Sequence, residues 1–317
     1  MAPVDRKNPK RAASSESSFS LMEFMREFPD DEACLLWLWR TRFAPDGENA
    51  YCPTCGVIRK FRRYEIGKQA WTCTSCSKRL TPTAGTIFHK SSTSLQLWFY
   101  AMWLMTSTRC GVSAKQLERE LGVTYKTAWR MFNLIRNKLM TQDDEGPLSG
   151  ELEADETWHG GKMRASDRRK AAAKGVTIGP HAKPRATVFG IVERGGRVVT
   201  MVVPSRYDYT LRSNLRQRVG PGASVYTDDY SGYNGLRQIY THHTINHTGR
   251  IYAEGHVHTQ TIEGFFSLFK NGVRGVYHPV SVKWLEGYLN EHAWRYNHRD
   301  DREAMFRRLL KRAALSA

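Results

Sequence analysis

The sequence lacks any long hydrophobic run. Its longest, residues 97–105, is about half of the ~20 residues that a helix needs to cross a bilayer. The N-terminal segment also lacks the apolar core of a secretion signal. Its Ser, Lys and Arg content is typical of a disordered basic arm, which we place at residues 1–20. We therefore expect a cytoplasmic protein without a membrane anchor.

Acidic residues are scarce relative to basic ones. The 317 residues include 48 Lys and Arg but 31 Asp and Glu, which gives a net charge of +17. The basic residues are spread through a chain rich in Trp and Phe, so a charged tail does not account for the excess. A polyanionic partner, most simply DNA, is the expected explanation. An anionic membrane surface is the alternative, but no long basic amphipathic helix supports it.

Cysteine is also infrequent, and four of the six cysteines fall into two CxxC pairs. Cys52 and Cys55 form one pair, Cys73 and Cys76 form the other, and 17 residues separate the pairs. This spacing is typical of a zinc ribbon with four thiolate ligands. Disulfides fit poorly in a chain without an export signal, and a redox CxxC is a weaker interpretation of two pairs. With all four positions taken by cysteine, the zinc ion is expected to be structural.

The remaining cysteines and the charges near the pairs allow weaker predictions. Cys34 and Cys110 lie in apolar surroundings and are expected to be core thiols. Four basic residues between the pairs are either phosphate contacts or a solvated charge run: Arg59, Lys60, Arg62 and Arg63.

Residues 91–140 have the pattern of a helical DNA-binding module. Residues 94–108 are bulky and apolar, which predicts a buried helix. Helix, turn and helix follow, with Ser113 and Thr124 as N-caps and Gly122 at the turn. In a helix-turn-helix the second helix leads into the major groove with its N-terminal residues. The candidate DNA-contacting residues are therefore Tyr125, Lys126, Thr127 and Arg130, and a plain helical hairpin with a basic face is the alternative.

The rest of the chain predicts an α/β catalytic domain. Residues 21–90 form the zinc ribbon with a preceding helix, and the Gly- and Pro-containing residues 141–150 form a linker. Residues 151–300 then alternate three meandering strands, a helix, another strand and further helices. This order suggests a ribonuclease-H-like core, followed by a C-terminal basic helix at 301–317.

Three acidic residues in this domain predict its chemistry. Asp155 lies in a strand, Asp228 ends another strand, and Glu263 lies in an amphipathic helix, 35 positions after Asp228. Helical spacing puts Glu263 on one polar stripe with Ser267, Lys270 and Arg274, opposite an apolar face. A carboxylate followed by cations on one helix face suits a site that binds metal and then phosphate.

Several longer motifs carry a family resemblance. The segments GELEADETWHGGK, VYTDDYSGY, HTQTIEGFFSLFKNGVRGVYHPVS and YLNEHAWRYNHR resemble zinc-ribbon insertion-sequence transposases of the ISXO-type group, as does GTIFHKSSTSLQLWFYAMWLM in the N-terminal half. The likeness covers roughly residues 52–299. The chain departs from that group at Gln260, where asparagine is usual, at Phe266, where tryptophan is common, and at Asn271, where a basic residue often stands. None of these departures removes a carboxylate.

The resemblance implies a DDE transposase with a ribonuclease-H-like fold that acts on the terminal inverted repeats of a mobile element and on target DNA. Its metal-binding acids correspond to Asp155, Asp228 and Glu263, and its lysine to Lys270. The implied cofactors are two Mg²⁺ (or Mn²⁺) ions in addition to structural Zn²⁺. Such a site would hydrolyse the strand at the element's end and then join that end to target DNA. The family also implies a homo-oligomer on DNA. Arg274, on the same helix stripe as Lys270, is a further candidate DNA contact.

Neighbouring groups are alternatives to these assignments. Asp229 could replace Asp228 as a ligand, Glu153 and Glu156 flank Asp155, and Glu254 lies in a Gly-flanked loop. His256 and His258 could bind metal, although histidines before a helix more often bond backbone or phosphate. The basic insert at 162–185 is expected to be either a mobile loop that orders on DNA or a solvated charge run.

Two other functions remain open at this point. The chain could be an inactive or domesticated DNA-binding regulator that retains its ribbon and helix-turn-helix, although the intact acidic trio argues against it. It could also be a ribonuclease-H-like nuclease that cuts without joining.

Overall fold

The computed structural model describes residues 19–65, 68–108, 110–142, 145–160, 165–175, 185–247, 249, 251, 253–278 and 280–315. The chain divides into two compact units, which are described separately here. Unit 1 comprises residues 1–139 and 298–317, and unit 2 comprises residues 140–297. The predicted arm at residues 1–20 lies outside the described residues except for its last two.

Unit 1 is built from helices around an aromatic core. Its helices are α1 (Leu21–Glu27), α2 (Asp31–Arg42), α3 (Leu95–Ser107) and α10 (Met305–Leu315). Ser20 and Glu23 form a capping box at the start of α1. Phe306 of α10 lies 5.7 Å from the ring of Phe24 and 5.9 Å from that of Phe28. The C-terminal helix thus packs into the same core as the first helix.

A four-stranded antiparallel sheet forms the ribbon of unit 1. Its strands are β1 (Asn49–Cys52), β2 (Val57–Arg63), β3 (Trp71–Cys73) and β4 (Arg79–Leu80), in that order. Trp39 of α2 stacks on Trp71 with ring centroids 4.6 Å apart, and its indole N–H donates to Gly47 O at 2.8 Å. Because so small a sheet has little core of its own, this stacking attaches it to α2.

Two shorter helices follow α3. Helix α4 (Ala114–Leu121) is capped by Ser113 and ends at Gly122, which has the left-handed φ of +63° that favours glycine. Helix α5 (Tyr125–Leu134) begins at Thr124, whose hydroxyl accepts from Thr127 N. A continuation, η1 (Ile135–Leu139), completes the helical part of unit 1.

Unit 2 contains a five-stranded sheet with the order β7-β6-β5-β8-β9. Strands β5 (Glu151–Gly160), β6 (Arg185–Glu193) and β7 (Val198–Val203) form an antiparallel meander. Strands β8 (Ser224–Asp228) and β9 (Thr241–Ile245) run parallel to β5. This mixed sheet agrees with the predicted α/β class and fits a ribonuclease-H-like fold.

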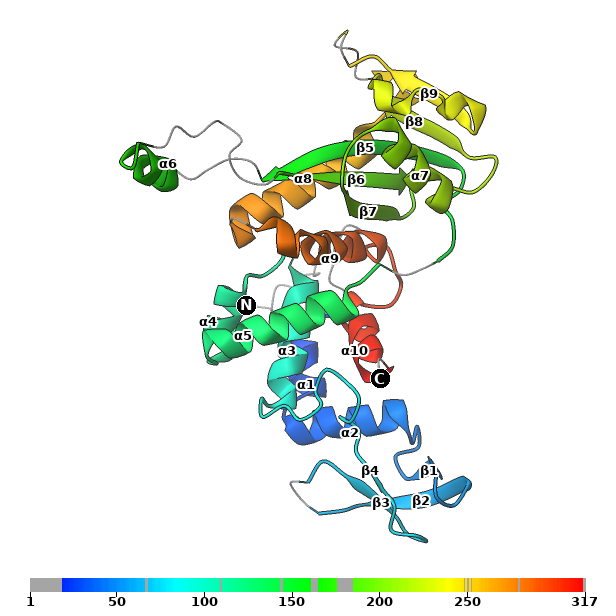
Figure 1. Cartoon of the computed structure of the whole chain (residues 1–317). Helices are drawn as coiled ribbons and strands as arrows, with labels where there is room; N and C mark the ends of the chain where they lie inside the picture. Colours follow the sequence, from blue (N-terminus) through cyan, green and yellow to red (C-terminus); the bar gives the residue numbers. More distant parts are fainter. Residues whose placement is uncertain are drawn as a thin grey trace, which may run out of the picture. The chain divides into compact units, whose positions relative to one another are not determined.

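Helices cover both faces of this sheet (Figure 1). Helix α7 (Asp208–Arg218) packs on one face, against Leu152, Ala154 and Val225. Helices α8 (Gln260–Gly272) and α9 (Leu285–Asn297) pack on the other, against Val188 and Val192. The remaining elements of the unit are short: η2 (Ser231–Tyr233), η3 (Leu236–Gln238), β10 (Ala253–Glu254), β11 (Val257–His258), η4 (Val273–Tyr277) and η5 (Val282–Trp284).

Gly190 of β6 sets how closely α8 approaches the sheet. A Cβ at this position would lie 2.8 Å from Ile262 Cδ1 and 2.9 Å from Phe266 Cζ. Both distances are far below van der Waals contact, so any larger residue would push the helix away from β6.

The structure departs from several expectations. Cys34 is buried as predicted, but Cys110 is exposed, so the core-thiol prediction is wrong for Cys110. Within the basic insert, α6 (Ala165–Ala172) is helical where a loop was expected, because alanine, arginine and lysine are strong helix formers. Leu148 of the expected linker is buried against the α7 face of the sheet. No helix in the described residues is long and apolar enough to cross a membrane.

Candidate functional site

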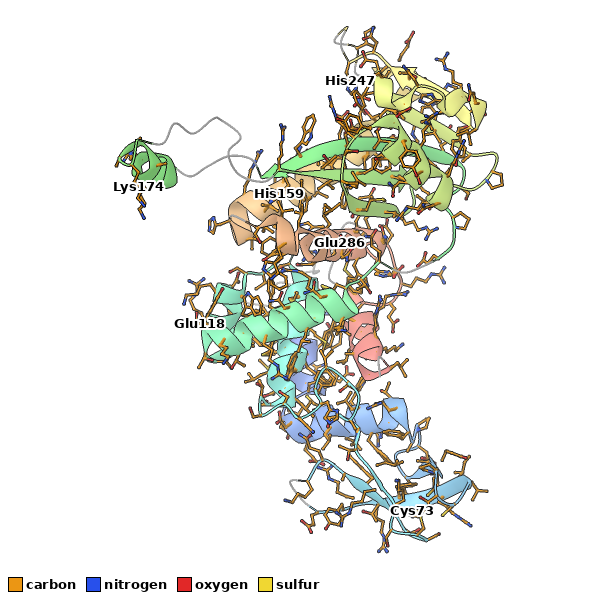
Figure 2. The ribbon with its side chains drawn as sticks, viewed as in Figure 1. Cys73, Glu118, His159, Lys174, His247 and Glu286 are labelled. Atoms are coloured by element: carbon orange, nitrogen blue, oxygen red, sulfur yellow. The ribbon has the colours of Figure 1, made fainter. Side chains whose placement is uncertain are left out.

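The four predicted zinc ligands meet in the ribbon. The sulfur atoms of Cys52, Cys55, Cys73 and Cys76 all lie within 4.8 Å of one another. Cys52 Sγ and Cys76 Sγ are 3.5 Å apart. Sulfurs bound to one tetrahedral zinc ion at ~2.3 Å would lie about 3.8 Å apart, so the observed spacing fits that geometry. Cys73 is labelled on the ribbon in Figure 2.

Two similar turns create this arrangement. Gly56 N donates to Cys52 O at 2.9 Å, and Ser77 N donates to Cys73 O at 3.0 Å. Gly56 and Ser77 both have a left-handed φ, of +70° and +61°. Burial opposes ionisation of Cys73, but the backbone N–H groups of Cys76 and Ser75 outweigh it and lower its pKa to about 6. The turn at Cys73 therefore favours the thiolate that zinc requires, whereas hydrogen bonding with the Cys76 sulfur raises the pKa of Cys55 to about 12.

Strand pairing in unit 2 brings two of the predicted acids together. Strand β5 pairs with β8 in parallel, with Glu151 opposite Ser224 and Glu153 opposite Tyr226. Continuing this register by two residues places Asp155 opposite Asp228. Residues at alternate positions share a face, so both carboxylates lie on the face covered by α8, since Leu152 and Val225 contact the α7 side.

The electrostatics of these acids reflect their proximity. Burial, followed by repulsion from Glu156 and Asp228 and more weakly from Glu263, raises the pKa of Asp155 to about 8. Burial also raises the pKa of Asp228, although the Tyr230 N–H, which donates to Asp228 Oδ1 at 3.1 Å, opposes the shift. Like charges thus accumulate at the carboxyl ends of β5 and β8, where a cation would relieve the repulsion.

A buried glutamate, Glu153, fixes the start of α8 against β5. Its carboxylate accepts from Thr261 N at 2.7 Å, Ile262 N at 3.1 Å and Thr261 Oγ1 at 3.0 Å. Arg194 Nε and His258 Nδ1 lie 2.9 and 3.0 Å from its Oε1. A carboxylate at a helix N-terminus satisfies otherwise unpaired N–H groups, so Glu153 positions the first turn of the helix that carries Glu263.

Glu263 lies on this first turn, partly exposed. Its Oε1 accepts from the buried hydroxyl of Thr259 at 2.7 Å and lies 3.8 Å from His247 Nε2. His247, labelled in Figure 2, follows β9 and favours the charged form of Asp228. One histidine therefore lies near two of the three predicted acids.

The two candidate metal sites differ in compactness. Among the residues that the structure describes, the four cysteines are the one group of three or more ligand side chains whose ligand atoms all lie within 4.8 Å of one another. The oxygens of Asp155, Asp228 and Glu263 do not all fall within that span. Lys270 is half-buried near the end of α8, and Arg274 is exposed in η4.

The alternative acids and histidines have other surroundings. Glu156 points to the opposite face of the sheet, where its Oε2 accepts from Tyr233 Oη at 2.6 Å. Asp229, Glu254 and His256 are exposed, and His258 contacts Glu153.

The predicted DNA-contacting residues lie at the start of α5. Tyr125, Lys126 and Arg130 are exposed, whereas Thr127 is half-buried and its N–H donates to the Thr124 cap. Ala128 is buried and faces the inside of the unit.

Sequence reasoning gave no role to Glu153 and Arg194. Arg194 donates to Glu153 and to His258 O, and its guanidinium lies 3.9 Å from the ring centroid of Tyr226. One signal was present in the sequence: a glutamate at an apolar strand position must find partners when buried.

Comparison with known proteins identifies the family. The family model described as the ISXO2-like transposase domain matches residues 147–297, which correspond closely to unit 2. An uncharacterized protein in transposable element ISH50 of Halobacterium salinarum is 28% identical over 250 residues, which are 75% of this chain and 82% of that protein. An uncharacterized transposase-like protein of Haemophilus influenzae is 32% identical over 102 residues, which are 32% of this chain and 81% of that protein.

The chain belongs to the ISXO2-like transposases. The family match and the relatives support an insertion-sequence transposase, and family membership implies a protein that acts on DNA.

Proposed function

We propose that the chain is a DDE transposase that binds the terminal inverted repeats of an insertion sequence, cleaves DNA at their ends and transfers the strand to target DNA. The observation that carries the proposal is the register of β5 and β8, which makes Asp155 and Asp228 neighbours on the face of the sheet covered by α8. Repulsion from Glu263 at Asp155 links the third acid to the pair.

The donor set fits hard divalent cations. Asp155, Asp228 and Glu263 offer carboxylate oxygens alone, the ligands that Mg²⁺ and Mn²⁺ prefer. Bound divalent ions would supply Lewis acidity to the reacting phosphate and lower the pKa of the attacking water or DNA hydroxyl. The ribbon cysteines would hold a separate, structural Zn²⁺.

The chain's own residues would align the strand. Lys270 stands two helical turns after Glu263 on the same face of α8, where its ammonium group can bind a phosphate beside the scissile bond. Arg274 continues that stripe. Glu153 would hold the helix so that Glu263 stays directed at the two aspartates.

Recognition of the element's ends is assigned to α4 and α5 as a helix-turn-helix. The exposed Tyr125, Lys126 and Arg130, with Thr127, lie at the N-terminus of α5, the end that enters the major groove in this motif. Exposed Trp129, 39% accessible, widens the same surface.

The test compares adjacent acids. Purified protein is incubated with Mg²⁺ and a labelled duplex that ends in the inverted repeat flanking the gene, and cleaved and joined products are counted. Asp228→Asn is expected to lower cleavage by about 100-fold or more, because the variant loses one of the carboxylates that would hold the divalent ions. Asp229→Asn is the matched control and should retain activity.

Three results would change the assignment. Equal loss in both variants would mean that the acid was assigned incorrectly. Cleavage without joined product would favour a nuclease, and binding without cleavage in the unmodified protein would favour a regulator.

A further inference from the structure

Cationic and aromatic side chains converge on the α7 face of the sheet, near the end of β8 that carries Asp228. Trp158 of β5 is 42% exposed. The guanidinium of Arg185 lies 4.4 Å from its ring centroid, and that of Arg206 lies 5.0 Å from it. Arg206 also lies 4.1 Å from the ring centroid of Tyr230. These four residues, here called the Trp158 cluster, come from two strands and two loops of unit 2.

Short contacts connect this cluster to the acids. Tyr230 N donates to Asp228 Oδ1 at 3.1 Å. Arg206 Nη1 lies 3.9 Å from Glu156 Oε1, and Glu156 N donates to Asp155 Oδ1 at 2.7 Å. Arg206 also favours the charged forms of Asp228 and Glu156. Because Glu156 and Trp158 alternate with Asp155 along β5, the cluster lies on the α7 face of the sheet. It approaches the acids where Arg206 and Tyr230 pass the end of β8.

Close packing holds the two loops of the cluster in place. A Cβ at Gly232 would lie 2.4 Å from Tyr230 Cε1 and 3.0 Å from Arg206 O. Only glycine allows the Tyr230 ring and the backbone of Arg206 to approach this closely. The arrangement is consequently set by the backbone.

More aromatic surface continues from Arg206. Tyr207 is 74% exposed and Tyr209 is 78% exposed, and both stand at the start of α7. Exposed aromatic rings interleaved with arginines are typical of surfaces that bind single-stranded nucleic acid, since every base offers a face for stacking. Bases inside an intact duplex cannot reach such a ring.

We infer that the Trp158 cluster binds an unpaired nucleotide of the strand that continues around the end of β8 from the scissile phosphate, with its base stacked on Trp158. Arg185 and Arg206 would then leave the ring face and bind the flanking phosphates, which their charge and exposure permit. This inference rests on the proposed function, because it takes the nearby acids as the reaction site. It adds a preference for locally unpaired DNA at that site.

The test measures binding alone. Fluorescence anisotropy compares a blunt duplex with the same duplex carrying a single-stranded tail of about five nucleotides, 3′ in one set and 5′ in the other. The buffer contains neither Mg²⁺ nor chelator, so that strand cleavage does not interfere and zinc stays bound. Unmodified protein should bind a tailed duplex more tightly than the blunt one.

Substitution of Trp158 gives the decisive comparison. Trp158→Ala should weaken binding of the tailed duplex by about 10-fold or more, the effect of losing one stacked base, and leave the blunt duplex unchanged. Trp158→Phe should retain most of the affinity. Trp284→Ala is the matched control, since Trp284 is 41% exposed and has Lys283 Nζ 5.1 Å from its ring centroid, but lies in η5 beside α9, outside the cluster.

The outcomes separate the hypotheses. If Trp158→Ala loses affinity equally for the tailed and the blunt duplex, the cluster is a general basic patch. If its affinity is unchanged, the cluster is only a structural contact between loops. Either result overturns the inference. Failure of the proposed function would appear elsewhere, as cleavage that survives Asp228→Asn, and thermal melting of each variant confirms that it is folded.

Discussion

The ribbon cysteines and the proposed catalytic carboxylates are brought together in opposite ways. In the ribbon, two turns each bring a pair of sulfurs together, and backbone N–H groups lower the pKa of Cys73 to about 6. In unit 2, the acids come from two strands and a helix, and burial with mutual repulsion raises the pKa of Asp155 to about 8. The first site is prepared for its ion by local geometry. The second depends on tertiary packing and is electrostatically strained without a cation.

Removal of the ribbon's metal should give the largest effect. Structural zinc sites contribute on the order of 10 kcal/mol to folding, so chelation or Cys73→Ser should unfold the ribbon. Because Trp39 stacks on Trp71 across this region, tryptophan fluorescence should change with the loss of zinc. Metal analysis should find one zinc per chain in the unmodified protein.

Cys110→Ser is the control for that experiment, since Cys110 is exposed and outside the cluster. Full zinc content in Cys73→Ser would contradict the assignment of the ribbon site.

Substitution of the buried glutamate tests how far the carboxylate site depends on packing. Glu153→Gln removes the charge that Arg194 and the start of α8 share, and breaking a buried pair in this way costs about 3–5 kcal/mol. Urea unfolding should show this loss. Cleavage should also fall by about 10- to 100-fold in the folded protein, as for groups that orient metal ligands.

Glu151→Gln is the matched comparison, because Glu151 also contacts Arg194, at 3.3 Å, but is exposed. Equal destabilisation by both changes would show that the helix contacts of Glu153 contribute nothing.

The raised pKa of Asp155 predicts a stability gain from a substitution that is expected to abolish the proposed activity. Its folded pKa of about 8 exceeds the ordinary value of 3.8. Between these values the folded state holds the proton more tightly than the unfolded chain, so stability decreases as pH rises through about 4 to 8. Asp155→Asn removes this dependence and should stabilise the metal-free protein at pH 8 by on the order of 1–3 kcal/mol.

Thermal melting at pH 5 and pH 8 without divalent ions measures this effect. The advantage of Asp155→Asn should be larger at pH 8, and an advantage that is equal at both values would refute the electrostatic explanation.

A smaller loss is expected at the glycine beneath α8. Gly190→Ala places a methyl group against Ile262 and Phe266 and should cost about 1–3 kcal/mol, as overpacking does. Gly195→Ala, in the turn after β6, meets no atom within 4 Å and tests backbone strain alone, since Gly195 has a φ of +72°. Equal melting temperatures for Gly190→Ala and the unmodified protein would mean that α8 can move without cost.

The same contrast explains what the sequence could predict. The zinc site could be predicted because each pair of cysteines is close together in the sequence, and the four sulfurs do lie together in the structure. The α/β class and the strands around Asp155 and Asp228 could be predicted from the alternation of apolar and polar residues and from the turn residues that follow. The roles of these acids, of Lys270 and of the residues on α5 stay predictions.

What the sequence could not provide are relations across long separations. Glu153 meets Thr261 across 108 positions, and the approach of α8 depends on the absence of a side chain at Gly190. The helix in the basic insert was missed because charge was weighed above helix propensity. Cys110 was misplaced because apolar neighbours in sequence do not guarantee burial.

The pairing of β5 with β8 has a consequence for tolerated length changes. Side chains alternate between the two faces of a sheet along each strand. Inserting or deleting one residue between Leu152 and Asp155 would therefore turn every later side chain of β5 to the opposite face. After a deletion, Glu156 would turn toward α8 in place of Asp155, and the acid beside Asp228 would carry one more methylene; after an insertion, no acid would stand there. Natural variants of this strand should therefore vary in composition but keep their residue count.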